Sequence, residues 1–423
     1  MARFARETLR NPTIAVVVDA SGATDGDDTI VEELVPPVRE PILGLGGDDT
    51  LTIYGVSPAL LATGDFGDID IDNETEADTF VFGDDTIVAA ISDGGFDTDT
   101  GVIVAGDTLH VSMTPDLGTS ITLSSGDDTL LSLNEAVQLA GDFEILTVTS
   151  LTTATVLVRM GDDVLIAQSG GYLSGDNLLT YLNFQDEFNV KTVVLGDDTL
   201  VGGDVAVGDT QELTITTISD YRHAVANVMM GDDVLSGGVM MIGDTQVLIF
   251  SSDWAISDMN LWMGDDRIIG SGQSEWLIGD VEVIRLFWSD SMLDRGLDNL
   301  DLDFGDDTLI SSSANETLVG DYVRVLDEHR FDQLDLDAVM ADFITGADTF
   351  IFEGDFGKDK IRDFEAGHDH IILSDIAYED IDQVGVEYDD ETGDLILDFT
   401  DLGGGTITIR DGGDVTINDF TFA

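Results

Sequence analysis

Short runs in which apolar and polar residues alternate, separated by Gly-Asp turns, recur along most of the chain. Residues 210–215 follow Gly208-Asp209, and residues 225–230 lead into the Gly-Asp-Asp that begins at Gly231. Alternation with a period of two is typical of strands that bury one face, whereas an amphipathic helix repeats every 3.6 residues. The pattern therefore predicts an all-β protein.

The triplet Gly-Asp-Asp marks an internal repeat. It begins at Gly26, Gly47, Gly83, Gly126, Gly161, Gly196, Gly231, Gly264 and Gly305, with the variant Gly-Ala-Asp at Gly346. The residue four after each Gly is apolar, as at Leu165, Leu200 and Leu235, so this column is expected to face a core. Repeats of this kind stack, which predicts a parallel β-solenoid whose coils lie about 4.8 Å apart.

A shorter Gly-Asp signal introduces an apolar alternation between successive triplets. It occurs at Gly106-Asp107, Gly141-Asp142, Gly175-Asp176, Gly208-Asp209, Gly243-Asp244, Gly279-Asp280 and Gly320-Asp321, and more weakly at Gly64-Asp65. We interpret each period as one coil with about three strands. The unequal spacing of the two turn signals leaves two smaller coils per period as an alternative.

The composition adds a very large negative charge. The chain carries 86 acidic and 16 basic residues, a net charge of −70, yet 43% of its residues are hydrophobic, which indicates a folded rather than a disordered chain. So few basic residues exclude nucleic acid as a partner and disfavour an anionic lipid surface. No apolar run reaches the length of a transmembrane segment, and the absence of cysteine excludes disulfides and thiolate metal sites.

Stacked coils place equivalent aspartates within about 5 Å of each other, where two carboxylates repel by about 3 kcal/mol at an effective dielectric constant near 20. The basic residues are too few to balance such columns. Ca²⁺ is the best match, because it takes six to eight oxygen ligands in flexible geometry, whereas Mg²⁺ demands a tighter octahedron. The predicted ligands are the third residues of the triplets: Asp28, Asp49, Asp85, Asp128, Asp163, Asp198, Asp233, Asp266, Asp307 and Asp348.

Residues 196–203, Gly-Asp-Asp-Thr-Leu-Val-Gly-Gly, resemble the haemolysin-type (RTX) calcium-binding repeat G-G-x-G-x-D-x-U-x. The resemblance implies a parallel β-roll with Ca²⁺ in its turns, the third-position Asp as side-chain ligand and the repeat Gly as a source of carbonyl oxygen. Only the second half of the consensus recurs faithfully here, and the period is about twice the usual coil of roughly 18 residues.

The C-terminal segments 346–352, 357–364 and 367–374 look like the C-terminal domain of serralysin-type secreted proteins, and residues 419–423 resemble the tail that type I secretion systems recognise. This resemblance implies Asp359 and Asp369 as further calcium ligands. It also implies export by type I secretion machinery to the cell surface or medium, without a cleaved N-terminal signal. The expected domains are an N-terminal arm with the first repeat and a Pro-rich linker (1–40), the solenoid (41–345) and the serralysin-like domain (346–423).

No catalytic motif stands out, although the abundant Asp residues hide any carboxylate pair of the glycosidase or epimerase kind. His368 and His370 are interpreted as surface residues rather than a zinc site. We therefore expect a non-enzymatic, secreted, calcium-dependent structural, surface-layer or adhesive protein. The alternative is a carbohydrate-binding or carbohydrate-active protein that uses a face marked by Trp254, Trp262, Trp276 and Trp288.

Self-association is a further expectation. Three of the sixteen basic residues, Arg3, Arg6 and Arg10, fall within the first ten positions. A cationic arm of this kind is expected to dock on the acidic turns of a neighbouring molecule and to promote higher-order assembly, unless the terminus is disordered.

Overall fold

The computed structural model describes residues 18–19, 29–34, 42–43, 47–56, 60–65, 68–72, 78–92, 102–114, 120–133, 137–150, 155–168, 171–184, 190–217, 225–252, 258–288, 300–327, 343–374, 376 and 383–423. The arginine arm, Asp28, Trp254 and the prolines at positions 36, 37 and 41 lie outside these residues. Apart from three short 3-10 turns, η3 (Thr400–Leu402), η4 (Gly412–Asp414) and η5 (Ile417–Asp419), the regular elements described are strands. The all-β prediction is confirmed.

One full coil runs through four strands. It consists of β13 (Val137–Ala140), the Gly141-Asp142 turn, β14 (Phe143–Ser150), β15 (Thr155–Arg159), the triplet at Gly161 and β16 (Val164–Ala167). Each strand pairs in parallel with its equivalent one period later, so the parallel β-solenoid is confirmed with one coil per period. The prediction of about three strands per coil was wrong, because two strands flank each of the two turn signals, which gives four strands per coil. The alternative of two smaller coils per period was also wrong.

The strands form four sheets, which we number in the order in which a coil visits them. Sheet I contains, in spatial order, β1 (Val18–Asp19), β3 (Ile42–Leu43), β5 (Leu60–Thr63), β9 (Val102–Ala105), β13, β17 (Tyr172–Ser174), β21 (Val205–Val207), β25 (Met240–Ile242), β29 (Trp276–Ile278), β33 (Thr317–Val319), β36 (Lys358–Ile361), β40 (Thr406–Ile409), β39 (Leu395–Asp398) and β38 (Gly385–Tyr388). Sheet II contains β6 (Asp68–Asp72), β10 (Thr108–Thr114), β14, β18 (Asn177–Phe184), β22 (Thr210–Thr217), β26 (Thr245–Ser252), β30 (Val281–Trp288) and β34 (Tyr322–Asp327). Sheet III contains β7 (Asp78–Val81), β11 (Ser120–Ser124), β15, β19 (Val190–Val194), β23 (Val225–Met229), β27 (Asp258–Trp262) and β31 (Leu300–Asp303). Sheet IV contains β2 (Thr29–Leu34), β4 (Thr50–Val56), β8 (Thr86–Ser92), β12 (Thr129–Ser132), β16, β20 (Thr199–Gly202), β24 (Val234–Ser236), β28 (Arg267–Ile269), β32 (Thr308–Ile310), β35 (Thr349–Glu353), β37 (His370–Ser374) and β41 (Phe420–Phe422).

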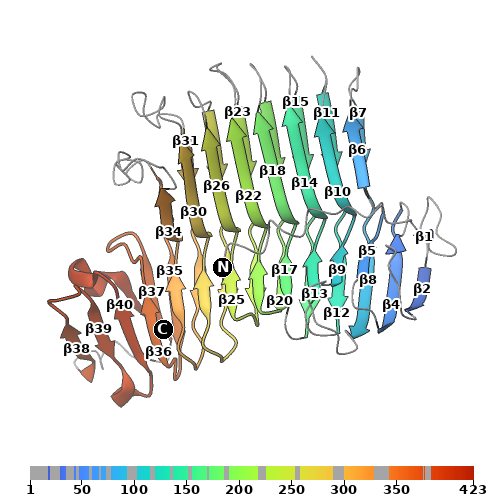
Figure 1. The fold of residues 1–423 in the computed structure, drawn as a ribbon. Coiled ribbons are helices and arrows are strands. Elements are labelled where there is room, and N and C mark those ends of the chain that lie inside the picture. Colours follow the sequence, from blue (N-terminus) through green and yellow to red (C-terminus); the bar gives the residue numbers. More distant parts are fainter. Residues whose placement is uncertain are drawn as a thin grey trace.

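The four sheets make two lobes that share one axis (Figure 1). Sheets I and IV form a main lobe along the whole solenoid, and sheets II and III form an inserted lobe that begins at β6 and ends at β34. Near both ends the coils pass only through sheets I and IV, and there the triplets lie 21 residues apart, from Gly26 to Gly47 and from Gly346 to Gly367. The longer periods therefore arise from an arm inserted between the two turn signals.

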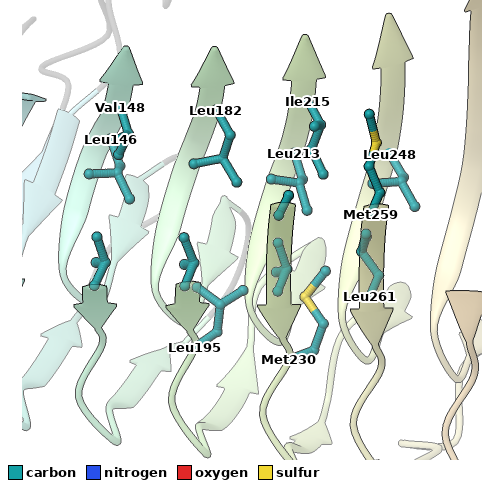
Figure 2. Close-up of a cluster of buried hydrophobic side chains, with 14 of the residues drawn as sticks. Leu146, Val148, Leu182, Leu195, Leu213, Ile215, Met230, Leu248, Met259 and Leu261 are labelled. Carbon is teal, nitrogen blue, oxygen red and sulfur yellow. The ribbon is translucent and has the colours of Figure 1, made fainter. Parts of the chain in front are cut away.

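Each lobe has its own apolar core. In the main lobe, Leu165 and Leu200 of sheet IV are fully buried in the same cluster as Leu173 of sheet I. In the inserted lobe, residues from sheets II and III stack in rows along the axis, because every second residue of each strand faces inward (Figure 2). A buried Leu or Val contributes about 1.5–3 kcal/mol, so both cores favour strict coil register.

The C-terminal end reverses the direction of the chain. Strand β40 is parallel to β36, but β39 is antiparallel to both β40 and β38, so sheet I ends at β38. Phe356 packs edge-on against Phe352 and Phe399, with ring centroids 5.1 and 5.8 Å apart. This arrangement caps the main-lobe core. Among the described residues there is no helix with the length and hydropathy needed to span a bilayer.

Candidate metal centre

Two columns of aspartates face each other where the lobes join, in a layer that we call the waist. The triplet column consists of the third residues of the triplets, each at most 2% exposed: Asp49, Asp85, Asp128, Asp163, Asp198, Asp233, Asp266, Asp307 and Asp348. The doublet column consists of the aspartates of the Gly-Asp turns, each at most 4% exposed: Asp65, Asp107, Asp142, Asp176, Asp209, Asp244, Asp280 and Asp321. A buried ionic layer thus separates the two apolar cores.

Carboxylates of the triplet column link successive coils. Asp163 Oδ1 accepts the backbone N–H of Asp128 at 2.6 Å, and Asp198 Oδ1 accepts that of Asp163 at 2.6 Å. The second oxygen, Oδ2, is buried and has no hydrogen-bond donor among the described residues at Asp85, Asp128, Asp163, Asp198, Asp233, Asp266 and Asp307. A buried charged oxygen without a partner is strongly destabilising, so this row requires either protons or cations.

Carboxylates of the doublet column link the two turns of one coil. Asp176 accepts the N–H of Gly196 at 3.2 Å, and Asp244 accepts that of Gly264 at 3.0 Å. An oxygen is again left without a donor at Asp107, Asp244 and Asp280. The Gly-Asp repeat was visible in the sequence, but these residues were missed as candidate ligands because nothing in their spacing shows that the two turns meet.

Three groups of these aspartates bring one carboxylate oxygen from each residue within 4.8 Å of the others. They are Asp65, Asp85 and Asp107; Asp107, Asp128 and Asp142; and Asp142, Asp163 and Asp176. Oxygens on opposite sides of a Ca²⁺ ion are about 4.6–5.2 Å apart, given Ca–O distances of 2.3–2.6 Å. Each group, formed from both columns, could hold a metal ion.

Glycine is required beside these aspartates by close packing. A Cβ on Gly141 would lie 1.8 Å from Asp163 Oδ2 and 1.8 Å from the carbonyl oxygen of Gly175. A Cβ on Gly161 would lie 1.6 Å from the carbonyl oxygen of Gly126. Both turn signals therefore begin with glycine because any larger residue would push the coils apart at the waist.

Burial dominates the electrostatics of the waist. It raises the pKa of Asp85 to about 8 and that of Asp142 to about 7. The pKa of Asp163 is also raised well above its ordinary value, first by burial and then by the neighbouring carboxylates of Asp142, Asp198 and Asp128. In the absence of cations, the fold thus favours the protonated form of these groups.

Asp369 follows Asp348 at the C-terminal end of the triplet column, and it is one of the two C-terminal residues expected to bind calcium. Its Oδ1 accepts the N–H of Asp348 at 3.1 Å and its Oδ2 accepts the N–H of Glu365 at 2.7 Å. Asp419 is satisfied in the same way by the N–H groups of Gly367 and Thr416. Backbone donors therefore occupy these carboxylates at the C-terminal end of the row.

Asp359, the other C-terminal candidate, does not lie at the waist. It is 2% exposed at the start of β36, where it accepts the N–H of Glu316 at 2.9 Å and the hydroxyl of Ser311 at 2.7 Å. Glu275 and Glu316 occupy equivalent positions in neighbouring coils, because the residues that follow them, Trp276 and Thr317, are paired in sheet I. These three acids form a separate stack at the turns between sheets IV and I.

The middle residues of the triplets are exposed to solvent. Asp162 Oδ1 accepts the N–H of Asp197 at 3.1 Å, and Asp197 repeats this contact with Asp232 at 3.0 Å. These middle aspartates form an outer ladder in contact with water. The two histidines also have separate partners, since His368 bonds to the carbonyl oxygen of Gly346 and His370 to the hydroxyl of Thr421.

Three of the four tryptophans expected to mark a carbohydrate-binding face are described, and they lie on different sheets. Trp262 ends β27 of sheet III, Trp276 begins β29 of sheet I and Trp288 ends β30 of sheet II. The guanidinium of Arg362 lies 5.4 Å from the ring centroid of Trp276. These positions do not form one aromatic row.

Comparison with known proteins does not place the chain in a family. No protein-family model matches it, and no curated protein is significantly similar to it. The structure shows a parallel β-solenoid in which buried aspartate clusters, repeated from coil to coil, could hold metal ions.

Proposed function

We propose that the waist binds Ca²⁺ and that this binding makes the folding of the solenoid calcium-dependent. The observation that carries the proposal is the row of buried Oδ2 atoms without hydrogen-bond donors, from Asp85 to Asp307. The metal ligands offered by the three clusters are carboxylate oxygens of aspartate, with no nitrogen or sulfur among them. An all-oxygen site suits Ca²⁺, and its flexible geometry tolerates ligands fixed by the coil spacing.

We further propose that the protein works outside the cell as a structural, surface-layer or adhesive protein, without a catalytic role. Extracellular calcium modules have dissociation constants of about 10⁻⁴–10⁻³ M, so millimolar Ca²⁺ would add about 0.4–1.4 kcal/mol of stability per site. Repeated over the coils, this sum is comparable to the usual 5–15 kcal/mol of net stability. The repeated coil fills most of the described chain, which supports a structural role over a separate effector.

Export in an unfolded state fits the same chemistry. Where free Ca²⁺ is scarce, repulsion among the carboxylates would keep a chain with a net charge of −70 open. The type I secretion route that the C-terminal resemblance implies requires such an open chain. The carbohydrate-binding alternative has less support, because the exposed Trp262 and Trp276 belong to different sheets.

A calcium titration of the purified full chain tests this proposal. Far-UV circular dichroism and light scattering are recorded at pH 8 from EGTA to millimolar Ca²⁺, with equal Mg²⁺ as control. We expect a cooperative transition from coil to β-structure with Ca²⁺ and a much weaker response to Mg²⁺, while a parallel increase in mass would support self-assembly. Complete β-structure in EGTA at this pH would contradict calcium-dependent folding.

A further inference from the structure

We infer that the waist holds one divalent cation per pair of doublet and triplet aspartates in a single shared row, in which the doublet aspartates bridge successive ions, so that the row loads cooperatively. This inference rests on the proposed calcium binding and adds its stoichiometry and coupling. Three features of the waist support it: the negative charge of each coil, the aspartates that neighbouring clusters share, and the position at which the row ends.

The buried charge sets the stoichiometry. Eight coils reach the inserted lobe, seven with all four strands and the last with three described strands, and each contributes one doublet and one triplet aspartate. The pairs are Asp65 and Asp85, Asp107 and Asp128, Asp142 and Asp163, Asp176 and Asp198, Asp209 and Asp233, Asp244 and Asp266, Asp280 and Asp307, and Asp321 and Asp348. The largest charge effects on Asp107 and Asp209 come from other carboxylates. A charge of −2 per coil is neutralised by one divalent cation.

The clusters share their members, which couples the ions. Asp107 belongs both to the cluster around Asp85 and to the cluster around Asp128, and Asp142 belongs both to the latter and to the cluster around Asp163. A carboxylate has two oxygens, so a doublet aspartate can give one oxygen to each neighbouring ion. An ion in one cluster then fixes the carboxylate that the next ion needs, and the bridging negative charge offsets the repulsion between neighbouring cations.

The row ends at a defined place. Beyond Asp348, both oxygens of Asp369 are occupied by backbone N–H groups, at 3.1 and 2.7 Å. Among the described residues, no buried carboxylate oxygen without a donor is found beyond Asp307. The C-terminal end of the row is thus closed by hydrogen bonds after Asp348, so eight ions, one for each aspartate pair, are the upper limit.

Calcium counting on the wild type and two variants of the full chain tests the shared row. Bound Ca²⁺ is measured by equilibrium dialysis with metal analysis, across concentrations up to saturation. The wild type should bind about eight ions in one steep transition. Asp176→Asn removes a bridge and should weaken two neighbouring ions and split the transition into two. Asp197→Asn changes an exposed triplet residue of the same coil; it is the matched control and should bind like the wild type.

The outcomes separate the inference from the proposed function. If Asp176→Asn loses at most one ion, while the others bind with unchanged midpoint and a Hill slope near one, the sites are independent and the shared row is wrong, although calcium binding stands. If the wild type binds no Ca²⁺, the proposed function itself fails.

A second measurement uses the wild type and therefore does not depend on the folding of a variant. The waist is loaded with Tb³⁺ in the presence of increasing fractions of Nd³⁺, as luminescent and quenching probes. Neighbouring ions in a row would be about 5 Å apart, the coil spacing, so terbium emission should be strongly quenched even at a low neodymium fraction. Quenching no greater than that of terbium bound to isolated chelators would overturn the row.

Discussion

At the scale of the residue, the two aspartates of each triplet differ because of where the backbone turns. Asp197 and Asp232 lie in water, whereas Asp198 and Asp233 are 1% exposed and carry an oxygen without a donor. The same residue type therefore serves as a solvated surface group in one position and as a candidate ligand in the next. The sequence predicted the third position as the ligand, but it did not show that this position is fully buried.

Replacing two waist aspartates by asparagine should separate metal binding from packing. In the double variant Asp198→Asn and Asp233→Asn, each amide keeps the Oδ1 that accepts the N–H of the preceding coil. We expect the calcium midpoint of folding to rise roughly two- to tenfold, because the lost sites no longer favour the folded state. In EGTA at pH 8 the variant should be at least as folded as the wild type, since two buried charges are gone.

The matched control for this experiment is the double variant Asp197→Asn and Asp232→Asn, whose side chains are exposed. Surface changes of this kind usually alter stability by less than about 0.5 kcal/mol, so its calcium midpoint should remain that of the wild type. Equal shifts in both double variants, measured by circular dichroism across a calcium titration, would mean that general acidity rather than the waist controls folding.

At the scale of the element, the inserted arm is an addition to a simpler coil. The coil from Gly346 to Gly367 passes directly from β36 through Asp363 and Phe364 to the next triplet-like turn. In the preceding coil, β34 and the chain up to Phe343 lie between Asp321 and Gly346. The sequence shows only that the period is longer here, whereas the structure shows a second lobe with its own core.

Deleting residues 322–342 should convert this coil into the short form. The deletion joins Asp321 to Phe343, so that Asp and Phe precede Gly346 by four and three residues, as Asp363 and Phe364 precede Gly367. We expect β-structure and the calcium midpoint to be retained. The melting temperature should fall modestly, because the Tyr322 contacts with Phe304 and Phe343, at 5.2 and 6.2 Å between ring centroids, are lost.

Circular dichroism during calcium titration and heating checks the shortened chain. Loss of all β-structure at saturating Ca²⁺ would show that the arm is an essential part of the coil rather than an addition. This arm is the best one to delete, because β34 is the last strand of sheet II, so its removal breaks no pairing between the other strands of that sheet.

At the scale of the whole molecule, the two Asp columns make proton binding and metal binding alternatives for the same fold. Burial raises the pKa of Asp142 to about 7, that of Asp85 to about 8 and that of Asp348 to about 10, all from an ordinary value of 3.8. Groups with raised pKa values stabilise the fold fully below the unfolded value, near pH 4, and lose this contribution as the pH rises through the folded values.

The metal-free chain should therefore fold in acid and unfold at alkaline pH. In EGTA we expect β-structure at pH 5 that is lost between about pH 6 and pH 10, and in millimolar Ca²⁺ we expect β-structure throughout this range. Far-UV circular dichroism against pH, with and without Ca²⁺, measures both curves. A metal-free chain that is most stable at high pH would contradict the buried, proton-dependent waist.

The sequence by itself determined the parallel solenoid, its coil repeat and the columns of aspartate. Alternating strands, ten turn signals in register and an apolar residue four positions after each triplet Gly are local properties, so they can be read along the chain. Stacking of like charges at the coil spacing follows from the repeat alone, and so does the need for counter-ions.

Only the tertiary structure decided that a full coil has four strands and that the two turn signals meet face to face between two cores. The distance along the chain between Asp142 and Asp163 contains no information about their separation in space, because the path of the inserted arm sets it. The structure also placed Asp359 with Glu316 and not in the waist. These pairings depend on contacts between residues far apart in the sequence, which a local pattern cannot specify.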